Sequence, residues 1–388
     1  MSEGSPRLLF VPVSGKFGTG EYSRSLAIAQ GAASQWPGAA LLFILSREAP
    51  YAATAPVPTE LLDSSPTFHT GAVVDIIERW RPDVVIFDNA GRTAQLRAAK
   101  RAGARVVYIS SRPRQRRKAF RLRWMRILDE HWIAYPRFIA GELQRMERLK
   151  LKFMHRPEVR FLDVILARPA SSAGGEPRPS VLARLGVEVG EYVLVVPGGG
   201  TGHPGAKDAV GEFLEAARAL AGAGVSVMFV GRAAGKASGG GAAASGGGGA
   251  GIAGLARDAG VARDAGAAEG GRLRRVDSLP QSELAELMRG AQLVLVNGGS
   301  TLLQAIACGK ACIAVPIAGD QPERIRRCVS AGVAVAAPLE SQAMVRAAQE
   351  LLGDDSRLNA LAGRAIALGL ADGVDVALRA LTPLLDGT

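Results

Sequence analysis

Short, continuously apolar runs alternate with amphipathic segments along most of this chain. In the first half the apolar runs lie at residues 7–13, 39–45, 83–88 and 104–110, and segments with a helical apolar period lie at 21–34, 70–80 and 93–103. Runs of Val, Ile and Leu without polar alternation are typical of parallel strands that are covered on both faces of a sheet. The pattern therefore predicts a doubly wound α/β domain.

The same alternation restarts in the second half, after a segment that has no apolar period. Residues 167–180 read ARPASSAGGEPRPS, a composition typical of an interdomain linker. The chain has 388 residues, of which 48% are hydrophobic, enough for two cores. We therefore expect an α/β fold of two doubly wound, Rossmann-like domains facing a cleft, with an N-terminal domain at 1–166, the linker at 167–180 and a C-terminal domain at 181–370.

Two further segments complete this expected organisation. Residues 232–271 consist mostly of Gly and Ala, so they bury too little apolar surface to offset the entropy cost of ordering. We expect a flexible insertion at a surface turn of the C-terminal domain. Residues 371–388 are expected to form a terminal helix that packs back on the N-terminal domain.

Composition excludes several classes of protein. The three cysteines, Cys308, Cys312 and Cys328, have no metal-ligand spacing, and the four histidines lie far apart, so no metal site is expected. No apolar run approaches the ~18 residues of a membrane-spanning helix, and the first residues lack the pattern of a signal peptide. The sequence thus predicts a cytoplasmic protein, which leaves attachment to a membrane surface open.

Three glycine-rich loops each follow a predicted strand and precede a predicted helix, at residues 14–20, 197–202 and 297–301. The first amides of a helix have no partner within the helix and carry a partial positive charge, and glycine lets a phosphate approach them closely. Tight strand-to-helix turns also use glycine for geometry alone. Two such loops at matching positions of the second half favour a nucleoside diphosphate.

The stretch VLVNGGSTLLQAIACGKACIAVPIAGDQPERI at 294–325 resembles the nucleotide-sugar signature of GT-B glycosyltransferases. The positions that fit are Gly299, Ala305, Gly309, Pro316, Asp320 and Gln321. LPQSELAELM at 279–288 is similar to the preceding family segment, and PGGGTG at 197–202 stands where the peptidoglycan GlcNAc transferase family has its diphosphate loop. GTGEYSRSLAIA at 18–29 is similar to the N-terminal G-x-G-H motif. The resemblance covers most of the chain.

The resemblance implies a role for each donor-side residue. The nucleobase would bind at the turn of Pro280, the ribose at Gln304, and the sugar hydroxyls at Asp320 and Gln321. The diphosphate would lie on Gly198, Gly199, Gly200, Thr201, Ser300 and Thr301, and Gly299 would also belong to the donor site. The sequence departs from the family in having Gln304 in place of a glutamate, Asn297 in place of His or Arg, and Ala311 in place of proline. His203 follows the second loop and is either a diphosphate contact or an ordinary loop residue.

The first loop, with Gly18, Thr19 and Gly20, would face the acceptor, and Glu21 stands where the family has its catalytic histidine. A carboxylate at that place could take the proton from the acceptor hydroxyl. Glu21 could equally be a first-turn residue that the helix dipole favours. Asp88, at the end of a predicted strand, is a second candidate base, with a helix cap as the alternative.

Positive charge is concentrated in one region of the chain, whose formal net charge is +11. Residues 112–128, the basic segment, hold eight basic residues and no acid, and we expect one helix with Phe120, Trp124, Ile127 and Leu128 on a single face. Such a helix suits an anionic membrane, an acidic glycan or nucleic acid, or it packs on the domain with solvated arginines. We favour the inner face of the cell membrane over nucleic acid, with a patch formed by Arg114, Arg116, Arg117, Lys118, Arg121 and Trp124.

Together these features predict an inverting, metal-independent glycosyltransferase of the cell envelope. It would need no cofactor and would move a sugar from a nucleotide-diphosphate donor, most simply a UDP-sugar, to a membrane-associated or lipid-linked acceptor. Two alternatives remain: a UDP-sugar hydrolase or 2-epimerase of the same fold, and a non-catalytic basic binding protein.

Overall fold

The computed structural model describes residues 5–15, 20–166, 180–198, 209–231 and 271–386, together with the backbone of 262–263. The chain divides into two compact units. Unit 1 comprises Met1–Ala170 and Leu370–Thr388, and unit 2 comprises Ser171–Gly369.

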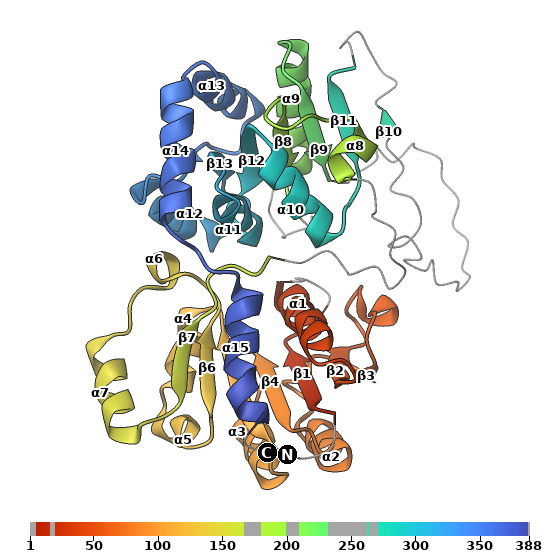
Figure 1. The fold of residues 1–388 in the computed structure, drawn as a ribbon, viewed down its shortest axis with the longest axis vertical. Helices are drawn as coiled ribbons and strands as arrows, with labels where there is room; N and C mark the ends of the chain where they lie inside the picture. The colour runs from red at the N-terminus through yellow and green to blue at the C-terminus, as the bar shows by residue number, and fades with distance from the viewer. Residues whose placement is uncertain are drawn as a thin grey trace, which may run out of the picture. The chain divides into compact units, whose positions relative to one another are not determined.

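Unit 1 is built on a seven-stranded parallel sheet in the order β3-β2-β1-β4-β5-β6-β7 (Figure 1). The strands are β1 (Arg7–Pro12), β2 (Ala40–Ser46), β3 (Thr59–Leu62), β4 (Val84–Asp88), β5 (Arg105–Ser110), β6 (Glu130–Ile133) and β7 (Glu158–Phe161). The order reverses direction between β1 and β4. In open parallel sheets this switch point, at the carboxyl ends of the strands, is where ligands bind.

Helices cover both faces of this sheet. One face packs on α1 (Gly20–Gln35) and α15 (Gly373–Leu385), and the other packs on α2 (Thr70–Trp80), α3 (Thr93–Arg101) and α5 (Leu122–Met125). A Cβ at Gly31 of α1 would lie 2.6 Å from Val374 Cγ1 of α15, so glycine permits these two helices to approach closely. The last helix thus packs within unit 1, beside the first (Figure 1).

Unit 2 repeats the plan with the order β10-β11-β9-β8-β12-β13-β14, parallel except at β10. Its strands are β8 (Val193–Val196), β9 (Val227–Val230), β10 (Ala262–Arg263), β11 (Leu273–Val276), β12 (Leu293–Asn297), β13 (Cys312–Val315) and β14 (Val335–Ala336). Its helices are α8 (Val181–Leu185), α9 (Ala209–Gly222), α10 (Gln281–Gly290), α11 (Ser300–Ala307), α12 (Gln321–Ser330), α13 (Ser341–Leu352) and α14 (Asp355–Ala367). The switch point of this sheet lies between β8 and β12.

These two sheets confirm the predicted fold class of two doubly wound α/β domains. The expected linker at 167–179 and most of the insertion at 232–271 lie outside the described residues. The elements that the sequence analysis missed include strand β3 and helix α7 (Arg145–Met154).

The prediction for the basic segment is wrong in two respects. The segment forms two short helices, α4 (Pro113–Ala119) and α5, instead of one. Its apolar side chains are at most 8% exposed, so they cannot face a membrane; they are Phe120, Trp124, Ile127 and Leu128. The stripe belongs to the domain itself, because Trp124 and Leu128 pack in a core cluster with β4 and β5.

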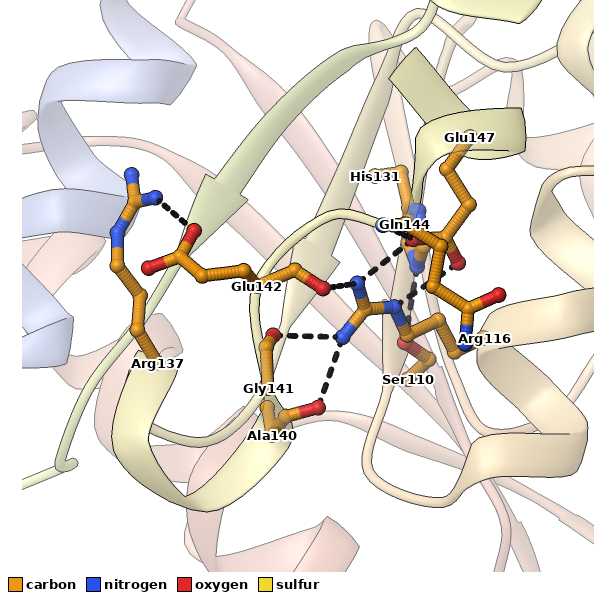
Figure 2. A network of polar contacts seen from close by, with 9 residues as sticks. All are labelled: Ser110, Arg116, His131, Arg137, Ala140, Gly141, Glu142, Gln144 and Glu147. Atoms are coloured by element: carbon orange, nitrogen blue, oxygen red, sulfur yellow. Dashed lines mark hydrogen bonds and ion pairs between the residues drawn. The ribbon is translucent and has the colours of Figure 1, made fainter. Parts of the chain in front are cut away.

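Two cations of the predicted patch, Arg116 and Lys118, make contacts with other residues of unit 1. Arg116 is buried and pairs with Glu147 at 2.7 Å (Figure 2). Lys118 donates to the Gly91 carbonyl at 2.7 Å and lies 4.3 Å from the Trp124 ring, and burial with neighbouring arginines lowers the pKa of Lys118 to about 8. Arg114, Arg117 and Arg121 remain exposed.

Candidate functional site

Glu21 lies at the switch point of unit 1, in the first turn of α1 directly after the loop that follows β1. Its carboxylate accepts a hydrogen bond of 2.8 Å from the side-chain amide of Asn89, the residue after β4. Asn89 Oδ1 in turn accepts from the backbone amide of Ser111, after β5, at 2.9 Å. The carboxylate is therefore oriented from two neighbouring strands while remaining half-buried, not sealed in the core.

Asn89 has a backbone conformation that favours its residue type. Its φ is +54°, in the left-handed region that asparagine tolerates better than most residues. The conformation turns the chain out of β4 so that the Asn89 side chain reaches both Glu21 and Ser111. A second contact at this edge is the stacking of Tyr51 on Tyr22, with ring centroids 4.0 Å apart. Burial, followed by the charge of Glu21, raises the pKa of Tyr51.

Asp88 does not suit the role of second base. Its side chain is fully buried, and both of its oxygens accept hydrogen bonds from Arg24 of α1, at 2.8 and 2.7 Å. Burial raises the pKa of Asp88 to about 6, while Arg24 lowers it. The pair ties α1 to β4 from within the domain. Asp88 thus supports the element that carries Glu21, and we withdraw it as a catalytic group.

The switch point of unit 2 brings two of the glycine loops together through one side chain. Asn297 ends β12; its Nδ2 donates to the Pro197 carbonyl at 2.7 Å, and its Oδ1 accepts from the Gly299 amide at 2.7 Å. Gly198 has φ +94°, and a Cβ there would lie 1.8 Å from Asn297 Nδ2. Asn297 is 6% exposed, so it clamps the loop after β8 to the loop after β12.

Helix α11 begins directly after the residues that Asn297 holds together. Gly299 is its N-cap, and Ser300 and Thr301 form its first turn, with Ser300 exposed. The first-turn amides of a helix have no partner within the helix and carry partial positive charge, so this end suits an anion. One turn further along, Gln304 Nε2 lies 3.4 Å from Gln281 Oε1 at the start of α10, next to Pro280. The predicted ribose and nucleobase residues are therefore neighbours.

The two predicted sugar-binding residues differ in their availability. Gln321 is buried, and its Oε1 accepts from the backbone amides of Ile317 at 2.9 Å and Gly298 at 3.2 Å. That oxygen shapes the loop and is not available to a sugar, and a contact of the Gln321 side-chain nitrogen with sugar hydroxyls stays a prediction. Asp320 is exposed and pairs with Arg324 at 3.1 Å, and Arg324 also donates to the Gly298 carbonyl at 2.6 Å. The sugar-binding role of Asp320 stays a prediction.

Several predicted residues lie outside the part of the chain that the structure describes. These are Gly18 and Thr19 of the acceptor loop, and Gly199, Gly200, Thr201 and His203 of the donor loop. Gly20 opens α1 and is exposed. Within the described ranges, no cluster of His, Cys, Asp and Glu could hold a metal ion. No helix in those ranges is both long and apolar enough to cross a membrane.

Comparison with known proteins identifies the fold. No family model matches the sequence, and no curated protein matches it. Among solved structures, the glycotransferase of kitacinnamycin is similar at TM-score 0.56 and 16% identity, over 96% of this chain and 97% of that one. The spinosyn rhamnosyltransferase SpnG, complexed with thymidine diphosphate, is similar at TM-score 0.57 and 15% identity, over 97% of this chain and 100% of that one.

A second kind of enzyme is equally similar. A candidate UDP-N-acetylglucosamine 2-epimerase from Listeria monocytogenes has TM-score 0.58 and 14% identity, over 99% of this chain and 98% of that one. At such identities the likeness concerns the fold. The chain has the two-domain fold of GT-B glycosyltransferases, which these epimerases share.

Proposed function

We propose that the protein transfers a sugar from a pyrimidine nucleoside-diphosphate donor, most simply a UDP-sugar, to an acceptor hydroxyl, with inversion at the anomeric carbon. The observation that carries the proposal is the Asn297 clamp, which holds two glycine loops beside the amino terminus of α11 at a sheet switch point. Solved structures of similar fold that contain thymidine diphosphate or UDP support this donor class.

In this reaction the diphosphate lies against the first-turn amides of α11, with the hydroxyls of Ser300 and Thr301 as further donors. These groups stabilise the negative charge that develops on the leaving β-phosphate oxygen. Gln304 accepts from a ribose hydroxyl through its amide oxygen, and the base lies at the turn of Pro280. Asp320 accepts from sugar hydroxyls.

Glu21 is the proposed general base. The acceptor oxygen attacks the anomeric carbon, the bond from that carbon to the β-phosphate oxygen breaks, and the acceptor proton passes to Glu21. The side-chain amide of Asn89 orients the carboxylate by donating a hydrogen bond to one of the two carboxylate oxygens. We further propose an acceptor that is associated with a membrane on its cytoplasmic side.

The second candidate is hydrolysis or 2-epimerisation of the same donor, which the similarity to a candidate 2-epimerase favours. Both reactions use the donor loops, and they differ in their products. Mass spectrometry after incubation with UDP- and TDP-sugars, with and without membrane extract, separates them. Transfer predicts a glycoside and release of nucleoside diphosphate only with extract. If free sugar or an isomer of the donor forms without extract, the reaction is hydrolysis or 2-epimerisation and not transfer.

The third possibility is a binding protein without catalysis. It predicts no product with any donor in this panel, with or without extract. That outcome would overturn the proposed function.

A further inference from the structure

Helix α7 exposes an apolar stripe, which we define as Met146, Leu149 and Phe153. Their side chains are 60%, 46% and 76% exposed. The spacings of three and four residues place them on one face of the helix. Because exposed apolar side chains that gather on one face mark interaction sites, the α7 stripe is a candidate interaction surface.

Basic side chains run beside this stripe. Arg145, Arg148 and Lys152 are all exposed, and at about 100° per residue they fall on an arc next to the stripe. The only acidic residue of α7, Glu147, is buried on the opposite side. The exposed face of α7 is therefore half apolar and half cationic.

A buried ion pair fixes which face of α7 points outward (Figure 2). Arg116 donates to both oxygens of Glu147, at 3.1 and 2.7 Å, and to the carbonyls of Ala140, Gly141 and Glu142 at 2.8–3.0 Å. These bonds use all five N–H groups of the guanidinium. Glu147 also accepts from the Gln144 amide at 2.9 Å, at the start of the helix. The helix is thus held at its first turn and cannot turn its stripe inward without breaking this network.

The exposed charge of the chain segment that contains the stripe is one-sided. Between residues 111 and 155 the exposed acidic residue is Glu142, which pairs with Arg137 at 3.0 Å. The exposed basic residues in this range are Arg112, Arg114, Arg117, Arg121, Arg123, Arg126, Arg137, Arg145, Arg148 and Lys152. Leu122 of α5, 49% exposed, adds a further apolar side chain, and Lys150 of α7 donates to the Phe120 carbonyl just before α5.

We propose that α7, with its apolar stripe and flanking cations, docks unit 1 on a membrane of anionic phospholipid. The three apolar side chains lie among the upper acyl chains and the cations contact headgroup phosphates, the arrangement of an interfacial amphipathic helix. Docking places unit 1 at the surface where a membrane-associated acceptor would lie. It does not depend on the chemistry proposed above, because it involves none of the donor-site residues.

The charges favour lipid over the other occupants of such a face. A second copy of the chain would bring two cationic faces together, which is unfavourable. Nucleic acid would satisfy the cations but offers no apolar layer for three protruding side chains. An anionic bilayer complements both halves of the face.

The test is co-sedimentation with vesicles of phosphatidylcholine containing phosphatidylglycerol. The apolar variant carries Met146→Gln, Leu149→Gln and Phe153→Gln, and the charge variant carries Arg145→Gln, Arg148→Gln and Lys152→Gln. We expect the apolar variant to bind at least ~10-fold more weakly, and the charge variant about 100-fold more weakly at low salt. Parent protein should bind poorly to pure phosphatidylcholine.

Matched controls replace equally exposed residues elsewhere. One carries Phe68→Gln, Val189→Gln and Ile366→Gln, and the other carries Arg97→Gln, Arg346→Gln and Arg379→Gln. Both should bind vesicles like the parent. Every variant should retain UDP binding in calorimetry, which separates failure of docking from failure of the proposed function.

Insertion is measured with Phe153→Trp, whose fluorescence should be quenched by lipids brominated in their upper acyl chains, whereas Phe68→Trp should not be. Four outcomes would overturn the proposal: equal vesicle binding by parent and apolar variant, equal binding to neutral and anionic vesicles, no quenching of Phe153→Trp, or a dimer in sedimentation that the apolar variant abolishes. Full vesicle binding by the apolar variant together with tight binding of mixed-sequence RNA by the parent would assign the face to nucleic acid instead.

Discussion

The side-chain amide of Asn89 holds the carboxylate of Glu21 at 2.8 Å, although the two residues stand 68 positions apart in the chain. The contact joins the loop after β1 to the end of β4, the two strands that flank the switch point of unit 1. A first-turn glutamate that only complemented its helix dipole would not need this partner. The contact therefore supports an oriented, functional carboxylate.

Replacement of Glu21 by Gln should lower kcat by a factor of about 10² to 10⁴, because loss of a positioned general base has effects of this size. Glutamine keeps the size and an acceptor for Asn89, so binding of the donor nucleotide should not change. Steady-state kinetics and calorimetry with UDP measure the two effects. Glu78→Gln, an exposed change in the same unit, is the control. Unchanged kcat in Glu21→Gln would remove Glu21 from the mechanism.

Replacement of Asn297 by Ala should lower UDP affinity by about tenfold and destabilise unit 2 by about 1–3 kcal/mol. The change leaves the Pro197 carbonyl and the Gly299 amide without their buried partner. Asn359→Ala, on the exposed side of α14, is the matched control and should change neither quantity. If Asn297→Ala binds UDP like the parent, the clamp does not organise the donor site.

Gly198→Ala should be more damaging to donor binding than Asn297→Ala. A Cβ would stand 1.8 Å from Asn297 Nδ2, and φ is +94°, where residues other than glycine are strained by about 1–3 kcal/mol. Calorimetry with UDP is the measurement, with Gly224→Ala as a control of similar positive φ (+91°) whose Cβ meets open space. Equal UDP binding by the two variants would show that the clash is relieved without cost to the site.

Replacement of Arg116 by Ala should lower the free energy of unfolding by about 3–5 kcal/mol, since Glu147 would remain buried without a partner. Arg117→Ala removes a neighbouring exposed arginine and should change stability by less than about 0.5 kcal/mol. Urea denaturation measures both. The double change Arg116→Met with Glu147→Leu should cost less than Arg116→Ala alone. Equal stability of all three variants would mean that the network does not hold α7.

His131 should make a contribution to the stability of unit 1 that is lost as the pH falls below about 6.5. His131 is fully buried, and burial, aided by Arg116, lowers its pKa to about 3 from the 6.5 of a free histidine. Between these values the unfolded chain binds a proton that the folded chain does not, so protonation favours unfolding by up to about 1.4 kcal/mol per pH unit.

His131→Gln should flatten this part of the pH–stability curve. Asp88 acts in the opposite sense, because its raised pKa of about 6 makes the folded state bind the extra proton between about 3.8 and 6. That contribution is present in both proteins and cancels in their difference. Urea midpoints measured from pH 7 to pH 4 provide the comparison. Parallel curves would mean that His131 does not contribute.

Much of the fold could be predicted because continuous apolar runs report buried parallel strands directly. Strand β3, at the edge of its sheet, was missed because TELL is short and half-buried throughout. Helix α7 was missed because its sequence, RMERLKLKFM, puts its apolar residues on the exposed side. The exposed position of these apolar residues follows only from the burial of Glu147 on the other side of the helix, which the sequence does not show.

Glycine loops and the ends of strands predicted the regions in which both candidate sites are proposed. The contacts within them depend on residues far apart in sequence. The sequence around Asp88 does not reveal that this residue is buried and paired with Arg24, and the same sequence could place it in an open cleft. The sequence around Gln321 likewise does not reveal that its side-chain oxygen is bound to backbone amides and so is not available to a sugar. The prediction for the basic segment was wrong for the same reason, because an apolar stripe of helical period looks the same in the sequence whether it packs on a protein core or faces a membrane.

The measurement that tests the account most directly is calorimetric titration of the full chain with UDP, TDP and uridine. If the diphosphate binds at the amino terminus of α11, UDP or TDP should bind with Kd below about 1 mM and uridine should bind far more weakly. In Gly198→Ala, the gain in affinity of UDP over uridine should be lost. Absence of heat with both diphosphates, or equal binding by parent and Gly198→Ala, would contradict it.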